Sequence, residues 1–314
     1  MTVSSGHVPV LLNEVLAYLN VAQGKKFIDA TVGNGGHSLA IAQSSSHAKI
    51  LGIDLDQASL DNLQSQVVQK GLDQRIKLVQ GNYKDIDKIQ DQTGFGLADG
   101  ILLDLGFSSV QLADPTRGFS FQEEAPLDMR YDQNARLTAL EVVSQYHPKE
   151  LEQVLSEYGE EKFARRIASE IIRRRKTTPV KTTLQLGDAI RAAVPAALRF
   201  KANDNIRRVF QAIRIEVNHE LNNLKEFLLK ALDLLSLNGR LVVISFHSLE
   251  DRIVKEFLNV QAKDCVCPPE FPTCVCDKAS RIRILTRKPV VAGSEELLAN
   301  PRSKPAKLRA CEKI

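Results

Sequence analysis

The residues best suited to bind a ligand lie where the first predicted strand meets the first predicted helix. The chain there reads Asp29-Ala-Thr-Val-Gly-Asn-Gly-Gly-His37. Glycines at such a junction permit a tight turn and let a ligand approach the backbone closely, while the start of the helix supplies unpaired N–H donors. The dinucleotide-binding pattern GxGxxG would require a glycine where this chain has Ser38. A ligand without a pyrophosphate is therefore favoured.

A single carboxylate strengthens this interpretation. Asp54 ends the second predicted strand, 19 residues after Gly35, a position from which an acidic side chain can bind both hydroxyls of a ribose. The glycine turn and Asp54 together indicate a nucleoside cofactor, and S-adenosyl-L-methionine is a nucleoside that carries no phosphate. Each feature also has a purely structural explanation, because glycines are common in turns and an aspartate often caps a helix.

Asp104 ends the fourth predicted strand, in the segment DLGFSS. In open parallel sheets the ligand lies beyond the carboxyl ends of the strands, so we expect Asp104 beside the reactive end of the cofactor. DNA methyltransferases that modify amino groups carry Asp-Pro-Pro-Tyr or a close variant at this point, whereas Leu105-Gly106 replace the prolines here. We take Asp104 as the main catalytic candidate, with Ser108 and Ser109 as weaker partners for a target amine.

Two further groups of polar residues have simpler interpretations. The segment Ser248-Leu-Glu-Asp251 fits a helix capping box, and the preceding His247 is interpreted as a hydrogen-bonded structural residue, with a catalytic base as the alternative. Gln211, Arg214 and Asn218 share one polar helix face, for which exposure to solvent is the simplest explanation.

Four of the five cysteines form a C-x-C-x6-C-x-C cluster: Cys265, Cys267, Cys274 and Cys276. This spacing is compact enough for a structural four-thiolate zinc site, although C-x2-C pairs are more usual. A reduced, metal-free loop stiffened by its three prolines is the alternative. Cys311 is left over, so a secreted disulfide framework describes the chain poorly. No catalytic metal is expected.

The candidate residues need a scaffold that brings strand ends together, and the first hundred residues predict one. Strand signals at 26–31, 49–56, 76–83 and 100–106 alternate with helix signals, of which one covers 38–43 and the next closes at Gly71. The run at 100–106 is nearly all apolar, as expected of a strand that is covered on both faces. This alternation predicts a doubly wound parallel α/β sheet.

The α/β pattern is interrupted after Leu112 and resumes later. A loop rich in glycine, proline and charge leads into helical segments up to about residue 199, without a strand signal. Apolar residues spaced by three or four from 210 to 235 predict one long helix that stops at Asn238-Gly239. Strands at 240–246 and 280–290 follow, with a helix between them. We therefore predict a discontinuous sheet domain, 1–112 and 206–314, with a helical substrate-recognition insertion at 113–205.

Charge is distributed unevenly along the chain. The total is +4, but residues 1–161 carry −10, residues 162–208 carry +10 and residues 277–314 carry +6. Basic segments such as 173–176 and the tail PRSKPAKLR suit a polyanion, because each phosphate that they neutralise releases counterions. A solvated helix face is the alternative for a single run, whereas two basic segments beside an acidic remainder favour nucleic acid.

Length and composition exclude several classes of protein. The chain has 314 residues, of which 43% are hydrophobic and 25% charged, values that allow a large core and argue against disorder. No run approaches the roughly 20 apolar residues of a membrane span, and the start lacks the charged segment and cleavage site of a signal peptide. We expect a cytoplasmic protein with no membrane association.

The longer sequence words are specific. HVPVLLNEVL, DATVGNGGHS, GILLDLGFSSVQL, FQAIRIEVNHEL, ISFHSLEDR and NPRSKPAKLR span the chain nearly end to end, and in these words it closely resembles the bacterial 16S ribosomal RNA (cytosine-N4-)-methyltransferase family. The resemblance implies a Rossmann-like, S-adenosyl-L-methionine-dependent methyltransferase fold with an inserted helical domain. It also implies cofactor contacts at Gly35, Gly36, His37, Asp54, Tyr83, Asp104 and Gln111.

The resemblance further implies methyl transfer to the exocyclic N4 amine of a cytidine in the decoding region of 16S rRNA, within a small ribosomal subunit or its precursor. We assign RNA contacts to basic residues in and near the insertion: Arg173, Arg174, Arg175, Lys176, Arg208 and Arg214. The sequence does not fix the oligomeric state, and a homodimer is compatible with it. A nicotinamide oxidoreductase and a non-enzymatic RNA-binding assembly factor are the rival functions. The missing third glycine opposes the first, and the second leaves the glycine turn and Asp54 without a role.

Overall fold

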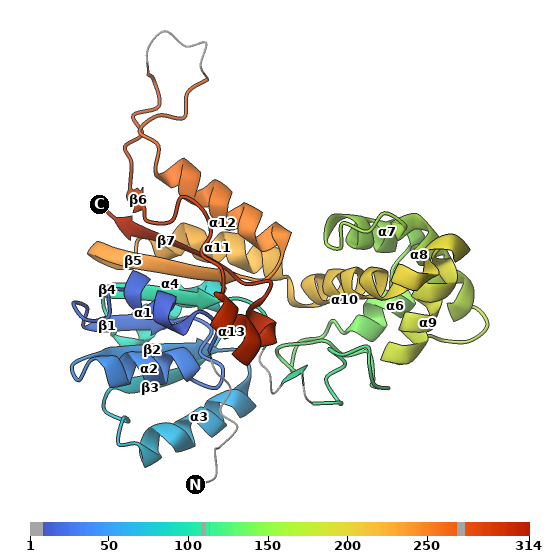
Figure 1. The fold of residues 1–314 in the computed structure, drawn as a ribbon, viewed down its shortest axis with the longest axis horizontal. Coiled ribbons are helices and arrows are strands. Elements are labelled where there is room, and N and C mark those ends of the chain that lie inside the picture. The colour runs from blue at the N-terminus through green and yellow to red at the C-terminus, as the bar shows by residue number, and fades with distance from the viewer. Residues whose placement is uncertain (1–8, 108–110, 113, 269–273) are drawn as a thin grey trace. The chain divides into compact units, whose positions relative to one another are not determined.

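The computed structural model describes residues 9–107, 111–112, 114–268 and 274–314 (Figure 1). The chain divides into two compact units. One, the sheet unit, comprises the residues up to Gly106 together with Asn222–Ile314. The other, the helical unit, comprises Phe107–Leu221. The helical unit thus extends further at both ends than the predicted insertion at 113–205, chiefly because the helix that spans residue 206 packs its apolar side chains into the core of the helical unit.

The sheet unit is built on seven strands in the order β3-β2-β1-β4-β5-β7-β6. Their bounds are β1 Lys26–Asp29, β2 Lys49–Asp54, β3 Ile76–Gln80, β4 Ala98–Asp104, β5 Leu235–Ser245, β6 Ile282–Ile284 and β7 Lys307–Lys313. Strands β1 to β5 pair in parallel, whereas β7 pairs antiparallel with both β5 and β6. The predicted doubly wound sheet is confirmed, and its winding reverses between the neighbouring strands β1 and β4.

Helices cover both faces of the sheet (Figure 1). Successive residues of the central strands point to opposite faces, so that Phe27 and Leu102 enter one core while Ile28 and Leu103 enter the other. Helices α1, α2 and α3 pack on the first face, and α4, α11 and α12 on the second. The helices of this unit are α1 Leu12–Tyr18, α2 Gly36–Ser44, α3 Gln57–Gln69, η1 Tyr83–Asp85, α4 Ile86–Thr93, α11 Glu220–Ala231, α12 Ser248–Gln261, α13 Ser294–Ala299 and η3 Pro301–Ser303.

Strand β7 includes the end of the basic tail PRSKPAKLR, whose binding to RNA remains a prediction. Residues 307–313 form a strand in the sheet, between β5 and β6. The Arg309 side chain is buried and donates hydrogen bonds to both carboxylate oxygens of Asp251, at 2.6 and 3.2 Å. The basic residues that suggested a solvated tail therefore serve partly to place a strand. The predicted strand at 280–290 shrinks to Ile282–Ile284.

The predicted single helix from 210 to 235 is also wrong. Helix α10, Ala202–Asn218, ends at His219, which adopts a left-handed conformation with φ 52°. Helix α11 begins at Glu220 and ends at Ala231, well before Asn238-Gly239, which lie inside β5. Apolar residues continue at helical spacing across the break, and for that reason the periodicity alone did not reveal it.

The helical unit has its own hydrophobic core, as the strand-free sequence pattern predicts. Apolar residues of several helices, among them Ile167, Ile190 and Ile213, are buried together. The helices are α6 Ala139–Gln145, α7 Pro148–Glu157, α8 Ala164–Arg175, α9 Thr183–Ala193, η2 Ala196–Lys201 and α10. Across both units, none of the helices in the described ranges is long and apolar enough to cross a membrane.

Candidate active site

The carboxyl ends of the parallel strands carry the acidic residues that the sequence singled out. Asp29 ends β1, Asp54 ends β2 and Asp104 ends β4. Strands β2, β1 and β4 are neighbours in the sheet, so these three ends line one edge at the point where the winding reverses. Open α/β sheets bind their ligands in the crevice at this point.

The glycine turn after β1 fits closely against its surroundings. Gly33 and Gly35 have positive φ values of 48° and 80°, and Gly35 is the N-cap of α2. A Cβ atom on Gly35 would lie 2.2 Å from a Leu63 side-chain carbon, and one on Gly36 would lie 2.6 Å from Pro9. Only glycine satisfies both the conformation and the space. The turn thereby presents the N-terminus of α2 to the crevice.

Asp54 holds the turn in place. Its Oδ2 atom accepts a hydrogen bond from the Gly33 amide at 2.8 Å, and its Oδ1 atom accepts one from the Asp56 amide at 2.9 Å. Burial raises the pKa of Asp54 from 3.8 to about 6, despite these two hydrogen bonds. Each oxygen of an ionised carboxylate has a second lone pair, so Asp54 can still accept hydrogen bonds from a ligand.

Asp104 is the carboxylate with unused bonding capacity. Its backbone amide donates to Thr31 Oγ1 at 2.7 Å, whereas its Oδ1 atom is buried and has no hydrogen-bond partner within the described residues. Burial, followed by the nearby charges of Asp29 and Glu250, raises the pKa of Asp104 well above its usual range. A buried acceptor without a donor is costly unless a ligand completes it.

His37 and Asn34 complete the polar lining on the turn. The His37 Nε2–H donates to the Val10 carbonyl oxygen at 3.0 Å, and its Nδ1 atom lies 3.7 Å from Asp104 Oδ2. The Oδ1 atom of Asn34 is buried and, like that of Asp104, has no partner among the described residues. Burial also raises the pKa of Asp29 to about 6, although Ser38 Oγ donates to it at 2.7 Å.

Two further candidate residues follow strands of the sheet: Tyr83 makes an aromatic contact, and His247 caps a helix. Tyr83 follows β3 and packs edge to face on Phe227 with a centroid distance of 5.7 Å. His247 is the N-cap of α12 and forms a capping box with Glu250, so the box lies one residue earlier than the predicted Ser248–Asp251. Because Glu250 accepts hydrogen bonds from the Phe246 and His247 amides, the structural interpretation of His247 accounts for its position.

Comparison with known proteins shows the family to which this chain belongs. The model of the MraW methylase family matches residues 4–314. Ribosomal RNA small subunit methyltransferase H of Carboxydothermus hydrogenoformans is 46% identical over 308 residues, which cover 98% of each chain. The protein of that name from Brevibacillus brevis is 42% identical over 314 residues, covering 100% of this chain and 99% of its own. This chain belongs to the MraW methylase family.

As a methylase with a doubly wound sheet, the protein uses S-adenosyl-L-methionine as its methyl donor. The crevice fits such a molecule. The glycine turn admits a ligand close to the backbone, Asp54 offers acceptors for ribose hydroxyls, and the unpartnered Oδ1 atom of Asn34 can accept a hydrogen bond from an ammonium group. The cofactor's positive charge also suits an edge on which burial raises the pKa values of three carboxyls.

Three further residues, Gln111, Ser108 and Ser109, were expected to contact the cofactor or the substrate. Gln111 is buried in the helical unit. Ser108 and Ser109 fall outside the described residues. The contact assigned to Gln111 by resemblance, and the weaker catalytic roles of the two serines, therefore remain predictions.

In the helical unit of the methylase, the polar face of α10 is not the solvated surface that was expected. Asn218 Oδ1 accepts from the Tyr131 amide at 2.7 Å and its Nδ2 donates to the Met129 carbonyl at 2.8 Å. Arg214 forms a two-point ion pair with Glu220, at 2.8 and 2.9 Å. This face anchors the loop before α6, and the pairing of Arg214 weakens its assignment to RNA.

The predicted RNA-binding arginines also have internal partners. Arg173 and Arg174 both donate to Glu170, at 2.7 and 2.8 Å. Arg175 donates to two carbonyl groups near the end of α6, at 3.2 and 2.7 Å. Arg208 pairs with buried Glu161 at 2.8 Å. Exposure distinguishes them, because the side chain of Arg173 is 67% exposed whereas Arg175 is partly buried.

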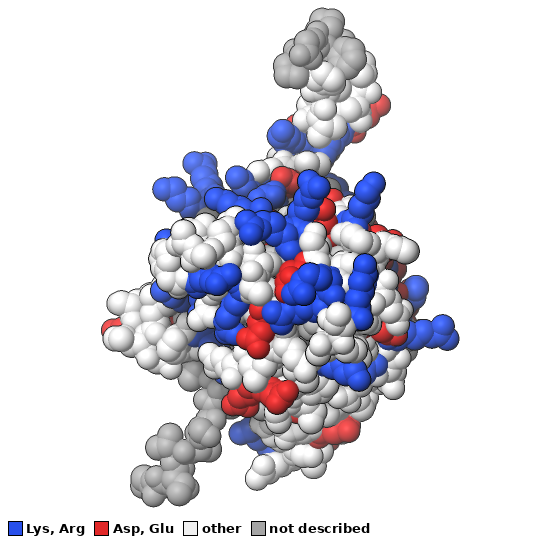
Figure 2. Space-filling view, turned by 90° about the vertical axis from the view of Figure 1, so that its right-hand side faces the viewer, with Lys and Arg blue, Asp and Glu red and all other residues white. Residues whose placement is uncertain are grey.

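An exposed aromatic residue was missed by the sequence analysis. Phe200 in η2 is 77% exposed, and Lys201 Nζ lies 5.4 Å from its ring centroid. Arg199 and Lys201 flank it on the surface. Lys and Arg side chains are spread over the face of the molecule shown in Figure 2. An aromatic ring beside basic residues is a typical contact for unstacked RNA bases. The sequence signal that could have revealed it is a phenylalanine placed between two basic residues, Arg199 and Lys201.

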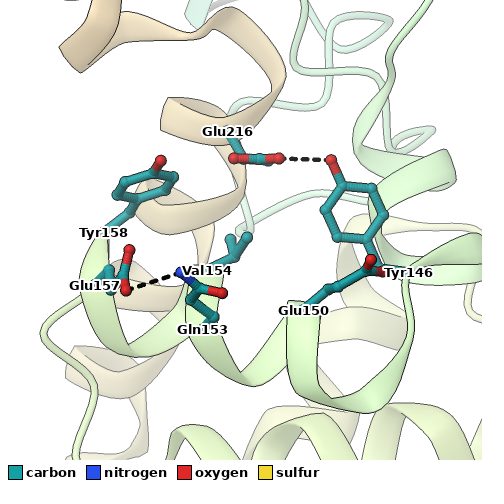
Figure 3. A pocket seen from close by; sticks show the side chains of 7 residues that line it. All are labelled: Tyr146, Glu150, Gln153, Val154, Glu157, Tyr158 and Glu216. Carbon is teal, nitrogen blue, oxygen red and sulfur yellow. Dashed lines mark hydrogen bonds between the residues drawn. The ribbon is translucent and has the colours of Figure 1, made fainter.

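A pocket in the helical unit has the opposite character (Figure 3). Its lining comprises Tyr146, Glu150, Gln153, Val154, Glu157, Tyr158 and Glu216. The Tyr146 hydroxyl donates to Glu216 Oε1 at 2.5 Å, and burial together with this carboxylate raises the pKa of Tyr146 well above its usual value. Three glutamates would repel phosphate, so this pocket is a poor site for RNA.

Proposed function

We propose that the protein transfers a methyl group from S-adenosyl-L-methionine to the exocyclic N4 amine of a cytidine in the decoding region of 16S rRNA. The observation that carries this proposal is the buried, unpartnered Oδ1 atom of Asp104 at the end of β4. An exocyclic amine brings N–H donors, which require an acceptor in a site from which water is excluded. The names of the relatives, small-subunit rRNA methyltransferases, support the substrate.

The residues of the crevice have separate tasks in this proposal. The turn at Gly35, Gly36 and His37 accommodates the cofactor against the backbone, and Asp54 accepts hydrogen bonds from its ribose hydroxyls. Tyr83 and Gln111 are additional contacts that rest on the resemblance. Asp104 lies at the reactive end, where its carboxylate can orient the target amine.

The chemistry depends on orientation. S-adenosyl-L-methionine supplies a methyl group on a positively charged sulfur. The amine nitrogen forms the new bond to carbon as the carbon–sulfur bond breaks, the sulfur keeps the bonding electrons, and the excess proton leaves to water. The amine nitrogen is a poor nucleophile because its lone pair is delocalised into the cytosine ring. Asp104 contributes by accepting a hydrogen bond from the amine N–H group, which favours a pyramidal nitrogen. Ser108 and Ser109 are proposed as secondary partners.

RNA binding is assigned to the helical unit and to its exposed residues in particular. Arg173 and Lys176 are exposed at the end of α8, and Phe200 offers a surface for stacking. Arg174, Arg175, Arg208 and Arg214 keep a secondary place in this proposal, because each has an internal partner and is less exposed than Arg173. The target base must leave its stack to reach the crevice.

The decisive experiment is methylation in vitro followed by nucleoside mass spectrometry. The protein is incubated with S-adenosyl-L-methionine and either small ribosomal subunits or deproteinised 16S rRNA, both from cells that lack the gene. We expect one modified nucleoside, N4-methylcytidine, in a decoding-region fragment. Methylation at ring carbon, at ring nitrogen or at a ribose hydroxyl would refute the N4 assignment. The comparison of the two substrates shows whether an assembled particle is needed.

Two variants test the role of Asp104. Asp104→Ala removes the acceptor, and we expect the rate to fall by roughly 100-fold or more. Asp104→Asn keeps an amide oxygen at this position, and we expect a smaller loss. If both variants methylate at the wild-type rate while they bind the cofactor normally, Asp104 does not orient the amine.

A further inference from the structure

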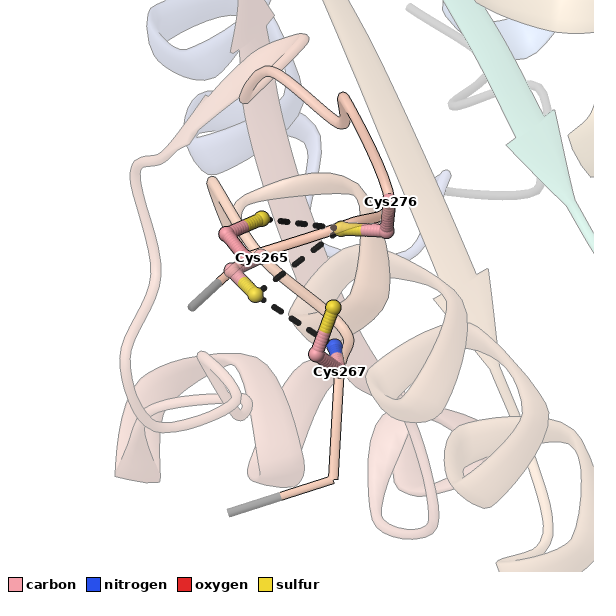
Figure 4. Close-up of side chains that lie close together, drawn as sticks. Cys265, Cys267 and Cys276 are labelled. Carbon is pink, nitrogen blue, oxygen red and sulfur yellow. Dashed lines mark hydrogen bonds between the residues drawn. The ribbon is translucent and has the colours of Figure 1, made fainter. Parts of the chain in front are cut away.

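The four clustered cysteines lie together in the segment that follows α12, although they come from its two arms (Figure 4). Their Sγ atoms all lie within 4.8 Å of one another. The distance between the sulfurs of Cys274 and Cys276 is 3.5 Å, and that between Cys276 and Cys265 is 3.8 Å. Four sulfurs thus enclose a common point.

These distances fit one kind of site. Four thiolates at about 2.3 Å from a zinc ion form a tetrahedron with edges of about 3.8 Å. A disulfide would require two sulfurs at about 2.05 Å, far closer than any pair described here. In an iron–sulfur cluster the four ligand sulfurs are divided among two or more iron atoms and do not all surround one point, whereas a single tetrahedral metal ion holds all four together. A single iron ion would have the same geometry as zinc, so elemental analysis has to distinguish the two.

Backbone donors point at two of the sulfurs. The Cys267 amide donates to Cys265 Sγ at 3.3 Å, and the Val275 amide donates to Cys267 Sγ at 3.4 Å. The second of these bonds joins the two arms of the loop. Amide hydrogen bonds to cysteine sulfur also surround metal-bound cysteines, where they help to orient the ligands.

The described residues of the loop form no hydrophobic core that would hold its two arms together. Val266 and Val275 are 49% and 70% exposed, and within the described part of 263–280 no residue is buried. At its base, the Arg281 amide donates to the Gln261 carbonyl and Lys278 Nζ to the Lys263 carbonyl. Small segments without a core usually need a metal or a covalent link to keep one conformation.

We propose that Cys265, Cys267, Cys274 and Cys276 bind one Zn²⁺ ion in a closed tetrahedral site. With four protein ligands the ion has no open position, so its role is to fix the loop between α12 and β6 and not to take part in methyl transfer. This proposal is independent of the proposed rRNA substrate.

The test uses the full-length protein, purified without chelators under reducing conditions. Zinc and iron are measured by elemental analysis in the wild type, in the double variant Cys274→Ser/Cys276→Ser and in Val275→Ser. The last variant changes an exposed residue of the same arm and keeps all four ligands, so it is the matched control. Cobalt is also added to metal-free protein, since four-thiolate tetrahedral cobalt has a characteristic intense visible absorption.

We expect about one zinc per chain in the wild type and in Val275→Ser, and almost none in the double variant. Trypsin should cleave at Lys263 and Lys278 faster in the double variant, while the thermal unfolding of the sheet unit changes little. Metal-free wild type that takes up neither zinc nor cobalt would overturn the proposal. So would iron in place of zinc, or a thiol count that shows disulfides among the four cysteines.

Discussion

Replacing Asp54 by asparagine should weaken cofactor binding without unfolding the protein. Asp54 accepts two backbone hydrogen bonds, from Gly33 and Asp56, and in our proposal two more from the ribose. Asparagine has one acceptor oxygen, and its NH₂ group would face a backbone donor. Loss of charge-assisted hydrogen bonds costs about 1.5–3 kcal/mol, which corresponds to a roughly 10- to 150-fold weaker affinity.

The stability of the variant follows from the raised pKa of Asp54. A rise from 3.8 to about 6 means that burial favours the protonated carboxyl over the ionised one by about 3 kcal/mol. The folded protein therefore holds this proton to a higher pH than the unfolded chain does, so the free energy of unfolding decreases as the pH rises from about 4 to 6. Asparagine resembles the protonated form and lacks this decrease, but its NH₂ group faces a backbone donor. Because these two effects oppose each other, we expect the variant without cofactor to lose less than about 2 kcal/mol of stability at pH 8.

Two measurements check this reasoning: isothermal titration with S-adenosyl-L-methionine, and denaturant unfolding without cofactor between pH 4 and pH 8. Asp61→Asn is the matched control, since it removes one exposed charge from α3. An affinity within about twofold of the wild type in folded Asp54→Asn would refute the ribose contact. A loss of more than about 2 kcal/mol of stability at pH 8 would refute the argument from burial.

Four other substitutions test separate parts of the structure. Gly35→Ala should lower the thermal midpoint and abolish cofactor binding, because its Cβ would lie 2.2 Å from a leucine carbon at a φ of 80°. Phe200→Ala should weaken rRNA binding roughly 5- to 150-fold, measured by filter binding, with unfolding unchanged, because its ring is solvent-exposed and stacking contributes about 1–3 kcal/mol per base. Arg175→Ala should cost about 1–3 kcal/mol of stability by freeing two carbonyl groups, a loss that denaturant unfolding detects. Arg309→Ala should cost about 1–3 kcal/mol in the same assay, since it leaves the partly buried Asp251 without its main partner while Lys307 remains near it.

The sheet could be predicted from the sequence because its first four strands carry strong local signals. Each is a short apolar run ended by a glycine or an aspartate, and the structure confirms all four. Strand β7 could not be predicted in this way. Its residues, Lys307–Lys313, mix apolar and charged side chains. They form a strand because they pair with β5 and because Arg309 donates a hydrogen bond to Asp251. Such long-range contacts leave no local pattern.

The candidate site shows the same contrast between local features, which the sequence predicts, and long-range contacts, which it does not. Strand ends and turn glycines are local features, so Asp54, Asp104 and Gly35 were placed correctly at one edge of the sheet. Internal pairing is not local. A run of arginines at 173–176 has the same appearance whether its side chains face solvent or, like that of Arg175, donate to carbonyl groups of a neighbouring helix. Charge counting therefore overestimated how many of these residues are free for RNA.

The three carboxyls at the sheet edge are hard to explain by stability alone. Asp29, Asp54 and Asp104 all have raised pKa values, with burial as the largest cause in each case. A protein under selection only for stability would replace such residues with neutral ones, since each charge disfavours the folded state at neutral pH. A positively charged ligand in the crevice reverses this balance, because it stabilises the ionised carboxyls that burial penalises. The penalty that burial imposes on these ionised carboxyls in the free protein is therefore relieved when a cation binds, and this relief adds to the affinity of the complex. A cofactor that carries a sulfonium and an ammonium group meets this requirement. A phosphate-containing dinucleotide would instead add to the repulsion.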